Sequence, residues 1–407
     1  MDLLTLGDLY ISDFVNEDED PRGGKYELKL TMTNSGAVKL SKSADPNLMY
    51  GKYWYQSGTN ASMKNELLDI VNSVTSKYKL PLMKSSIWLD IACNDGTLLS
   101  MLDPQITRVG VDPVDDSFKA KSEKHADLII QDFFSADKYL ANMDRADVIT
   151  AIAMFYDLED PDGFLLDVAK SLKDDGVFVV QMSYTPLMIE QIAFDNICHE
   201  HLYYYTLQTI NALFKKNGFK IIDCQLNETN GGSFRIFAMK DSANVSKFGS
   251  QPYRDVAKFR VESLLGYELR GKYNSPSIWS EFDRNIKELK TKTVDFIKQA
   301  KASGKTVWGY GASTKGNTLL QYFGLDNTLI DGIAERQTEK FGLKTVGTNI
   351  PIYSEEEMRA AKPDFLLVLP WHFINEFVER EYKYLEDGGY FIVPCPQFKI
   401  IGKEDIK

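Results

Sequence analysis

The sequence predicts an α/β protein in which two parallel-strand units follow one another along the chain. Short apolar runs recur between residues 87 and 182 and again between residues 306 and 393, at the length of buried strands. Segments with helical periodicity separate these runs, which is the pattern of repeated βα units. A polar stretch with glycine and proline at 242–251 divides the two series. We therefore expect a small N-terminal domain at 1–60, an α/β domain at 61–241, a linker and helices at 242–303, and a second α/β domain at 304–407.

Residues 1–60 mix strand, loop and aromatic signals. Strands are expected at 26–31 and 37–40, and an acidic loop at 17–20. An aromatic cluster follows at Tyr50, Tyr53, Trp54 and Tyr55. Such a cluster either joins two domains as a hydrophobic plug or covers a ligand as a lid, and the sequence leaves both interpretations open. Helical periodicity then begins at Ser62.

The stretch 86–100 predicts a strand, a tight turn and a helix, and it is the first candidate ligand site. Residues 87–91 are apolar apart from Asp90, Asn94-Asp95-Gly96 provides turn residues, and Thr97 is expected to open a helix. A turn at the carboxyl end of a strand leaves backbone N–H groups facing the crevice in which open α/β sheets bind ligands. The cofactor-binding candidates at this turn are Asp90, Ala92, Asn94 and Gly96.

Two further strands end in acidic residues that suit a nucleotide. The strand at 108–111 ends at Asp112, about 20 residues after the first turn, from where a carboxylate reaches a ribose diol. The strand at 126–130 leads to Asp132 and Phe133, an acceptor for an exocyclic amine beside an apolar ring. A single small turn after a strand is often a plain connection, but three such sites in register indicate a nucleotide-sized cofactor.

The remaining elements of this domain complete its strand order. Strands are expected at 147–152 and 177–182, with a helix between them that starts after Pro161 and ends at the Asp174-Asp175-Gly176 turn. Strands at 219–224 and 233–239 are close enough to form an antiparallel hairpin at the sheet's edge. Five βα steps capped by a hairpin are the order of a class I methyltransferase. The order predicts S-adenosyl-L-methionine as the cofactor and S-adenosyl-L-homocysteine as the product.

The last part of the chain predicts two helices and a second Rossmann-like domain. Residues 254–302 are helical with a break at 271–276. A strand at 306–310 leads into the glycine-bearing turn GYGASTKGN, and a helix continues over 318–323. Further strands are expected at 329–334, 365–369 and 390–393.

Composition limits the class of protein. The 407 residues are 43% hydrophobic and 26% charged, the balance of a globular chain that can bury proper cores. No run approaches the roughly 20 apolar residues of a membrane span, and MDLLTLGDLY lacks the order of a signal peptide. We therefore expect a cytoplasmic protein. Its four cysteines have no metal spacing, so we expect free thiols in a reducing compartment. A net charge of −11 without a basic patch argues against nucleic acid as a partner.

Side chains that can move protons gather after the fifth strand. The run CHEHLYYYTL holds two of the chain's four histidines, His199 and His201, with Glu200 between them. A histidine beside a carboxylate can move a proton near neutral pH, and a place beyond a strand's carboxyl end faces the crevice. Three successive side chains cannot share one face, so a metal site is disfavoured. A structural pair, with one histidine capping a helix and the other packed, stays open.

A series of separate motifs occurs in the order typical of one family. These are YWYQSG at Tyr53, LDIACNDGTLL at Leu89, AMFYDLEDP at Ala153, FDNICHEHLYYY at Phe194, NGGSFR at Asn230, WGYGASTKGNTLL at Trp308, GTNIPI at Gly347 and VLPWHF at Val368. Over nearly its whole length the chain resembles the nucleotide-sugar C-methyltransferases, typified by enzymes that methylate C3 of a 4-keto-6-deoxy sugar. The resemblance implies a small N-terminal domain that usually carries zinc, a methyltransferase domain, and a C-terminal Rossmann-like domain that helps to hold the nucleotide sugar.

Three positions depart from the family pattern. The second zinc pair of the family, in Cys-x-x-Cys-Gly, falls on Met32 and Ser35, so we predict no metal. The glycine usual after the first strand is Ala92, which should narrow the turn. Cys198 stands where the best-known sugar methyltransferases have a tyrosine before His-Glu-His, so the proton donation assigned to that tyrosine does not carry over directly.

The resemblance implies C-methylation through an enolate. Such an enzyme needs a base at the C–H beside a ketone, a hydrogen-bond donor for the enolate oxygen, and the sulfonium methyl in line. The family match indicates His201 as the base, with Glu200 and His199 tuning or orienting it, and Tyr55 as a phenol above the site. Ala153 is a further cofactor contact, and the expected substrate-binding residues are Asn230, Gly232, Ser313, Thr314, Lys315 and His372. The turn from Gly311 to Lys315 would give helix N-terminal amides and one cation to the sugar's pyrophosphate, and His372 either lines that crevice or is packed.

Two rival functions remain open from the sequence. In an O-methyltransferase on a similar sugar, the same histidine would deprotonate a hydroxyl. A non-catalytic module that binds nucleotide sugar or cofactor would explain the lost cysteines and Cys198. The expected partner is a nucleotide sugar, and the expected oligomer is a monomer or a homodimer.

Overall fold

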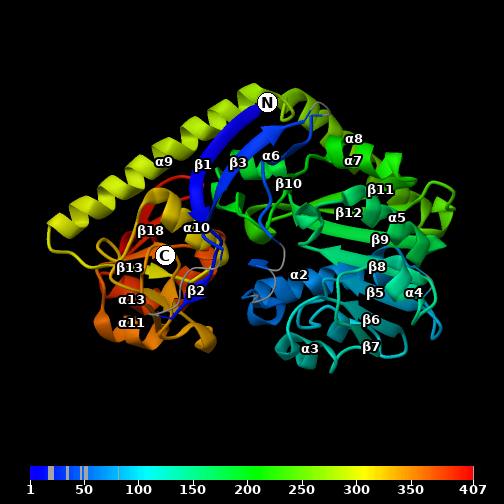
Figure 1. Ribbon diagram of the computed structural model, residues 1–407, viewed down its shortest axis with the longest axis horizontal. Helices are drawn as coiled ribbons and strands as arrows, with labels where there is room; N and C mark the ends of the chain where they lie inside the picture. Colours follow the sequence, from blue (N-terminus) through cyan, green and yellow to red (C-terminus); the bar gives the residue numbers. More distant parts are fainter. Residues whose placement is uncertain (17–22, 34–35, 46–47, 50–53, 81, 407) are drawn as a thin grey trace.

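The computed structural model describes residues 1–16, 23–33, 36–45, 48–49, 54–80 and 82–406. Two α/β lobes lie side by side, and the N-terminal strands and a long helix bridge them (Figure 1). The predicted acidic loop at 17–20 and the aromatic residues Tyr50 and Tyr53 lie outside the described residues, as does Ser35.

The first lobe carries a seven-stranded sheet with the order β11-β12-β9-β8-β5-β6-β7. Its parallel strands are β5 Ile87–Ile91, β6 Thr107–Val111, β7 Leu128–Ile130, β8 Ala146–Ile152 and β9 Leu172–Ser183. The strands β11 (Phe219–Asn227) and β12 (Ser233–Lys240) form the predicted antiparallel hairpin, and β12 pairs with β9. This order confirms the class I methyltransferase sheet.

Two local predictions in this lobe are wrong. The helix expected from Thr97 is a single 3-10 turn, η3 at Leu99–Met101. It ends there because Asp103 precedes Pro104, and a proline disfavours helical backbone at the residue before it. The turn expected at 174–176 lies inside β9, which starts directly after α5 (Pro161–Ser171). A register shift in the pairing of β8 with β9 accommodates these residues as a bulge.

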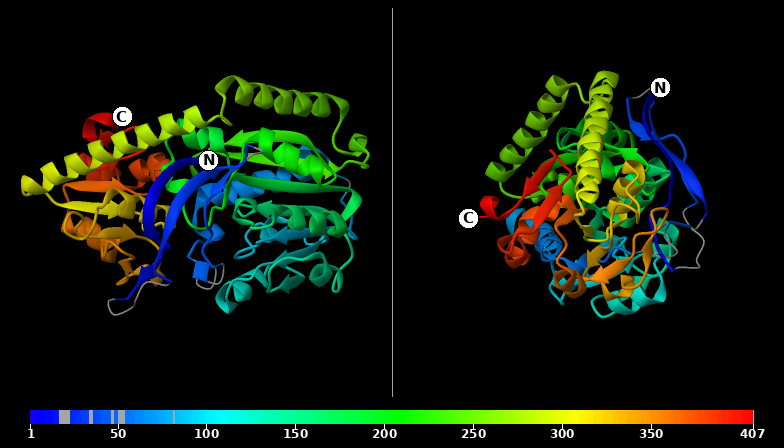
Figure 2. Two further views of the ribbon diagram at one scale, coloured as in Figure 1. Left: turned by 45° about the horizontal axis from the view of Figure 1, so that its top comes forward. Right: turned by 90° about the vertical axis from the view of Figure 1, so that its left-hand side faces the viewer.

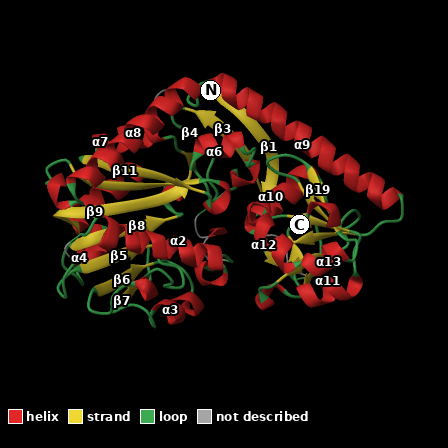
Figure 3. Ribbon diagram, turned by 180° about the vertical axis from the view of Figure 1, so that it is seen from behind, coloured by secondary structure: helices red, strands yellow, loops and turns green. Residues whose placement is uncertain are grey.

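Alternate residues of β5 face two helical layers, which fixes the strand in the interior of the sheet. Trp88 packs in a cluster with α2 (Ala61–Asn72), whereas Leu89 packs with α5 and α7 (Leu207–Lys216). The remaining helices of the lobe are α3 Asp116–Ser122, α4 Ala136–Leu140, α6 Thr185–Glu190 and α8 Gln251–Gly271. Figure 3 shows these layers from behind.

The second lobe carries a six-stranded sheet with the order β16-β14-β13-β17-β18-β19. Its strands are β13 Val307–Tyr310, β14 Ile333–Glu335, β16 Ile352–Ser354, β17 Phe365–Val368, β18 Tyr390–Val393 and the antiparallel β19 Lys399–Ile401. Its helices are α10 Thr314–Phe323, α11 Glu355–Ala361, α12 Ile374–Arg380 and α13 Tyr382–Glu386. This is the expected Rossmann-like domain. The sequence did not predict β16 and β19, because three-residue strands carry too little periodicity.

The N-terminal strands join the two lobes. The strands β1 (Asp2–Tyr10), β3 (Lys25–Met32) and β4 (Val38–Leu40) share a sheet with β10 (Tyr203–Tyr204) of the first lobe. The short β2 (Phe14–Val15) pairs with β15 (Lys344–Thr345) of the second lobe. Buried residues of β1 and β3 belong to one hydrophobic cluster with the long helix α9 (Pro276–Ala302) and the second sheet. Figure 2 shows α9 running along this join.

The domain boundaries predicted at 60, 241 and 303 stay predictions. None of the helices in the described part of the chain has the length and apolar character needed to cross a membrane.

Candidate functional site

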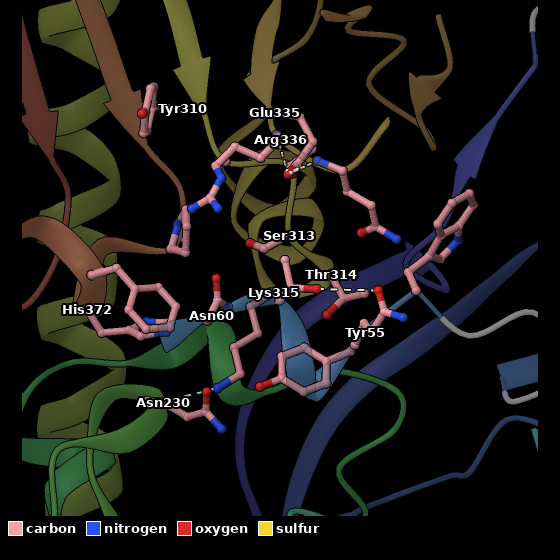
Figure 4. Close-up of a pocket in the computed structure, with 18 of the residues that line it drawn as sticks. Tyr55, Asn60, Asn230, Tyr310, Ser313, Thr314, Lys315, Glu335, Arg336 and His372 are labelled. Atoms are coloured by element: carbon pink, nitrogen blue, oxygen red, sulfur yellow. Dashed lines mark hydrogen bonds between the residues drawn. The ribbon is translucent and has the colours of Figure 1, made fainter. Parts of the chain in front are cut away.

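A cavity of about 1280 Å³, open to solvent, lies between the two lobes. The first lobe and the segment before α2 contribute Trp54, Tyr55, Gln56, Thr59, Asn60, Ala153, Tyr156, His201 and Asn230 to its wall. The second lobe contributes residues 310–315 after β13, residues 334–337 at the end of β14, and Pro370, His372 and Phe373 after β17. The lining therefore comes from the carboxyl ends of parallel strands in both sheets, where α/β proteins bind their ligands. Figure 4 shows ten of these residues from both lobes labelled in one cavity.

His201 lines this cavity as a neutral imidazole with one free nitrogen. Its Nδ1 lies 2.8 Å from the carbonyl oxygen of Asn196, and a carbonyl only accepts, so Nδ1 carries the proton. Nε2 keeps its lone pair and has no hydrogen-bond partner among the described residues. The Tyr156 ring packs against the imidazole with the centroids 4.1 Å apart. Burial, together with the charge of Lys315, lowers the pKa of His201 to about 3.

His199, which the resemblance implies as a residue that tunes or orients His201, is not in the wall of the cavity. Its Nε2 lies 3.3 Å from the carbonyl oxygen of Tyr26 in β3, and its ring meets the Tyr26 ring edge-on. Burial lowers the pKa of His199. The two imidazoles diverge because the backbone makes a turn here, with the N–H of His201 bonded to the carbonyl of Cys198, whereas alternate side chains align only in an extended strand.

Glu200 faces Asp157 rather than the cavity. One carboxylate oxygen of each residue is buried without a hydrogen-bond partner in the described part of the chain. Burial, with the Glu200 charge as a second cause, raises the pKa of Asp157 well above its usual range. Among the described residues, no hydrogen bond joins Glu200 or His199 to the imidazole of His201.

Lys315 reaches from the first turn of α10 across to the first lobe. Its Nζ donates a hydrogen bond to Asn196 Oδ1 at 2.6 Å. Desolvation lowers the pKa of Lys315, and the nearby Asp195 carboxylate opposes this shift. Asn196 thus holds Lys315 through its side chain and His201 through its backbone carbonyl. The sequence had placed Lys315 at the pyrophosphate, but its ammonium lies against the first lobe.

Tyr55 belongs to a segment that covers the turn after β5. Asn94 Nδ2 donates to the Tyr55 carbonyl at 3.1 Å, and the Gly58 N–H donates to Asp95 Oδ2 at 2.8 Å. Burial and the Asp95 charge raise the pKa of Tyr55, so the phenol keeps its proton and can donate it in a hydrogen bond. Trp54 instead packs on the N-terminal strand β2. The described part of the aromatic cluster therefore both covers the turn and joins the N-terminal strands to it.

The turn after β5 has left-handed backbone at alternate positions. Ala92, Asn94 and Gly96 have φ values of +59°, +53° and +76°. Ala92 therefore adopts the left-handed backbone conformation that suits glycine, at a cost in backbone strain. The effect of alanine at this position is this strain, in place of the expected narrowing of the turn. At Gly96 a Cβ would lie 2.8 Å from Cα of Ser122, so this position requires glycine.

Asp112 holds this turn in place and can still accept hydrogen bonds from a ligand. Its Oδ2 accepts the N–H of Asn94 at 2.7 Å, and its Oδ1 accepts the N–H of Val114 at 3.1 Å. Each carboxylate oxygen can accept a further hydrogen bond, which suits the two hydroxyls of a ribose. Burial raises the pKa of Asp112, and the two backbone N–H groups oppose this shift.

Asp90 adds a second buried acid beneath the same turn. It accepts the Thr150 hydroxyl at 2.6 Å, and burial, followed by the Asp112 charge, raises its pKa to about 7. Asp90 and Asp112 are not in the wall of the cavity between the lobes, but two acids beside a backbone turn suit a cofactor that carries a sulfonium cation and a ribose. The residues present therefore fit S-adenosylmethionine.

The other cofactor candidates lie at the ends of β7 and β8. Asp132 accepts the N–H of Phe133 and pairs with Lys138 at 2.6 Å, which lowers its pKa. The Phe133 side chain is 49% exposed. Ala153 lines the cavity, with a φ of +56°, directly after β8. The acceptor predicted at Asp132 therefore already has a lysine partner on the surface.

The second lobe contributes a helix N-terminus and a guanidinium. Ser313 caps α10 by accepting the N–H of Gly316 at 3.0 Å, and Thr314 starts the helix beside it. His372 also lines this wall, and burial, with the Lys315 charge, lowers its pKa to about 3. Arg336 extends from the end of β14 into the cavity (Figure 4).

Asn230 and Gly232 have different roles. Asn230 lines the cavity, and its carbonyl lies 3.4 Å from Nζ of Lys315. Gly232 is not in the wall of this cavity, and its assignment to the substrate stays a prediction. A Cβ there would lie 2.7 Å from Cβ of Leu187, and packing against that side chain explains the glycine.

The sequence did not single out Asn196, Tyr156, Asn60 or Arg336. Asn196 stands in the FDNICHEH motif and Tyr156 in AMFYDLEDP, so both were within quoted motifs but carried no chemical signal. Arg336 follows the second strand of a Rossmann-like unit, the place where such folds often recognise a nucleotide, and that position could have identified it.

Two family models match successive parts of the chain. A family model described as a methyltransferase domain matches residues 61–223, and one described as a C-methyltransferase C-terminal domain matches residues 228–396. The C-methyltransferase NovU of Streptomyces niveus is 25% identical over 99% of this chain and 95% of its own length. The chain belongs to the C-methyltransferases. This C-methyltransferase uses S-adenosylmethionine, in keeping with the acids Asp90 and Asp112 at the turn after β5.

Solved methyltransferase structures match part of the chain at low identity. An S-adenosylmethionine-dependent methyltransferase from Clostridium acetobutylicum is 16% identical, with 45% of this chain and 93% of that chain covered at a TM-score of 0.34. The N-methyltransferase NodS from Bradyrhizobium japonicum is 13% identical, with 44% and 94% covered at a TM-score of 0.33.

We expect the C-methyltransferase to be indifferent to metal chelation. Met32 stands where the resemblance places a zinc cysteine, and a thioether does not replace a thiolate ligand. No group of three or more His, Cys, Asp or Glu side chains in the described ranges is arranged to hold a metal ion. Incubation with a chelator followed by desalting should leave the melting temperature and the methyl-transfer rate unchanged. Stoichiometric zinc in elemental analysis of the purified protein would contradict this.

Proposed function

We propose that this C-methyltransferase methylates the carbon beside the ketone of a nucleotide-linked keto sugar. The observation that carries the proposal is His201, a neutral imidazole whose unprotonated Nε2 belongs to a cavity shared by both lobes. The wall of this cavity comes from both lobes, which suits a substrate with a sugar at one end and a nucleotide at the other. Its second-lobe wall offers the N-terminus of α10 and Arg336, and both suit a diphosphate.

The reaction follows from what each group can do. His201 Nε2 takes a proton from the carbon beside the ketone, the electrons of that C–H bond form a C=C bond, and the carbonyl electrons move to oxygen. Bound S-adenosylmethionine supplies an electrophilic methyl group on a sulfonium. Transfer of that methyl to the carbon would leave the S–CH₃ electron pair on sulfur and restore the ketone. His201 finally releases its proton to solvent and returns to the neutral form that burial favours.

Two neighbours keep the base in position. The ring of Tyr156 packs on the imidazole, and the Asn196 carbonyl fixes the tautomer that leaves Nε2 free. The Tyr55 phenol points toward the same end of the cavity as Lys315, where it can hydrogen-bond to a sugar hydroxyl (Figure 4).

The test is an incubation with S-adenosylmethionine and a panel of 4-keto nucleotide sugars carrying deuterium beside the ketone. We expect at least one sugar to gain one methyl mass and to lose its deuterium. Retention of deuterium in a methylated product would indicate O-methylation. Binding of S-adenosylmethionine in calorimetry without methylation of any sugar in the panel would indicate a non-catalytic module.

A further inference from the structure

We propose that the Lys315 ammonium binds the substrate oxygen that becomes negative on deprotonation, and that Asn196 positions this ammonium beside His201. The inference rests on the proposed function, because it needs a ketone whose neighbouring carbon loses a proton. It assigns Lys315 to the reacting end of the substrate and leaves the diphosphate to the second lobe.

The hydrogen bonds of Lys315 leave a donor for a ligand. An ammonium has three N–H groups. One donates to Asn196 Oδ1 at 2.6 Å, and a second can reach the Asn230 carbonyl at 3.4 Å. The third has no partner in the described part of the chain, and Lys315 lines the cavity. The free donor is therefore available to an oxygen in the cavity.

Asn196 links this cation to the base. Its Oδ1 also accepts the Ser183 hydroxyl at 3.2 Å, and its Nδ2 donates to the Ala193 carbonyl at 3.1 Å, so the orientation of the amide is set by three partners. The backbone carbonyl of the same residue accepts His201 Nδ1 at 2.8 Å. A single buried residue, 2% exposed, thus sets the distance between ammonium and imidazole.

The pairing of a neutral base with a neighbouring cation suits enolate formation. The imidazole removes the proton, and a fixed positive charge stabilises the oxygen on which negative charge develops. The charge of the buried Asp195 carboxylate opposes the desolvation that lowers the pKa of Lys315. Asp195 is itself held by the indole N–H of Trp371 at 3.1 Å.

The position of Lys315 also argues against a pyrophosphate contact. A lysine that serves the helix N-terminus would extend beside the amides of α10, whereas this side chain crosses to Asn196 and Asn230 of the first lobe. Arg336 remains on the second-lobe wall as a cation with planar donors that suit phosphate oxygens.

The experiment replaces Lys315 by methionine and separates rate from binding. The probe is thymidine diphosphate-linked 4-keto-6-deoxyglucose deuterated beside the ketone, and thymidine diphosphate alone is the binding probe. Deuterium loss with S-adenosylhomocysteine present reports proton removal without methyl transfer. We expect Lys315→Met to slow both deuterium loss and kcat by roughly 10²- to 10³-fold, with the Kd for thymidine diphosphate unchanged.

Two further variants make the result decisive. Asn196→Ala removes the side-chain acceptor but keeps the backbone carbonyl for His201, and should slow deuterium loss by roughly tenfold. Lys290→Met is the matched control, because this half-buried lysine of α9 bonds the Tyr322 carbonyl outside the cavity and should change neither rate nor Kd.

The outcomes distinguish the inference from the function on which it rests. A parent enzyme that removes no deuterium from this probe or from any other sugar of the panel overturns the proposed function and the inference together. A parent enzyme that does so, with Lys315→Met equally fast, overturns the inference alone. A large rise in the Kd for thymidine diphosphate with kcat retained would instead assign Lys315 to the pyrophosphate.

Discussion

Replacement of His201 by asparagine should lower turnover by roughly 10²- to 10⁴-fold while both ligands still bind. Asparagine is polar and of similar size, and its amide can replace Nδ1 as donor to the Asn196 carbonyl. It has no basic nitrogen, so the proton beside the ketone has no acceptor of adequate strength. The check is kcat measured beside calorimetric affinities and a melting curve.

The assignment of His201 as the base also predicts how kcat/KM changes on the acid side of its pH profile. The base is active when unprotonated, so its contribution to kcat/KM should fall only as pH drops through about 3. His201 itself should therefore add no acid limb between about pH 5 and 8, and a limb near pH 7 would belong to Asp90, whose pKa is about 7. Because the folded-state pKa lies below the usual 6.5, the unfolded chain binds this proton more tightly, and stability from this group is lost as pH falls from 6.5 toward 3.

The matched control for His201 is His199→Asn. His199 bonds the Tyr26 carbonyl among the N-terminal strands and stands apart from the cavity wall. Its replacement should lower the melting temperature and leave the rate per folded molecule near the parent value. If His201→Asn folds, binds and turns over at the parent rate, the base assignment is lost, and Tyr55 becomes the residue to replace.

The sequence could predict the elements whose geometry is local. The strand and turn from Ile87 to Gly96, the acid at Asp112 and the hairpin at the sheet edge depend on short-range patterns, and the structure confirms the sheet that they imply. His201 could be singled out because histidines are rare in this chain and because the motif follows a strand. These are positions at which residue type and chain order together limit the geometry.

The sequence could not predict what depends on contact between distant segments. The pairing of β4 with Tyr203 and Tyr204, and of β2 with β15, sets how the two lobes face each other. That arrangement decides that Lys315 crosses to Asn196 and that His199 turns toward Tyr26. Gly232 shows the same limit, because the glycine is required by a φ of +110° and by the nearby Leu187 side chain, which the sequence does not reveal.

Replacement of Asp112 by alanine should weaken binding of S-adenosylmethionine by about 1.5–3 kcal/mol for each ribose hydrogen bond that is lost. The carboxylate also holds the N–H groups of Asn94 and Val114, so alanine leaves two buried donors without an acceptor. The turn after β5 would then lose its fixed conformation in addition to the direct contacts. Calorimetry should show a Kd raised at least tenfold, because about 1.4 kcal/mol corresponds to a factor of ten.

Asp115→Ala is the control that separates ligand contact from loss of a backbone acceptor. Asp115 caps α3 three residues further along and accepts the N–H groups of Ser117 and Phe118 at 2.8 and 3.4 Å. Its loss should cost about 0.5–2 kcal/mol of stability, as for other N-caps, without changing the affinity for S-adenosylmethionine. Both variants remove an aspartate that accepts hydrogen bonds from two backbone N–H groups. Only Asp112 bonds the turn after β5, where S-adenosylmethionine is expected to bind. Equal affinity in the two variants would therefore mean that the ribose does not bind at Asp112, and that the carboxylate serves only to hold the turn.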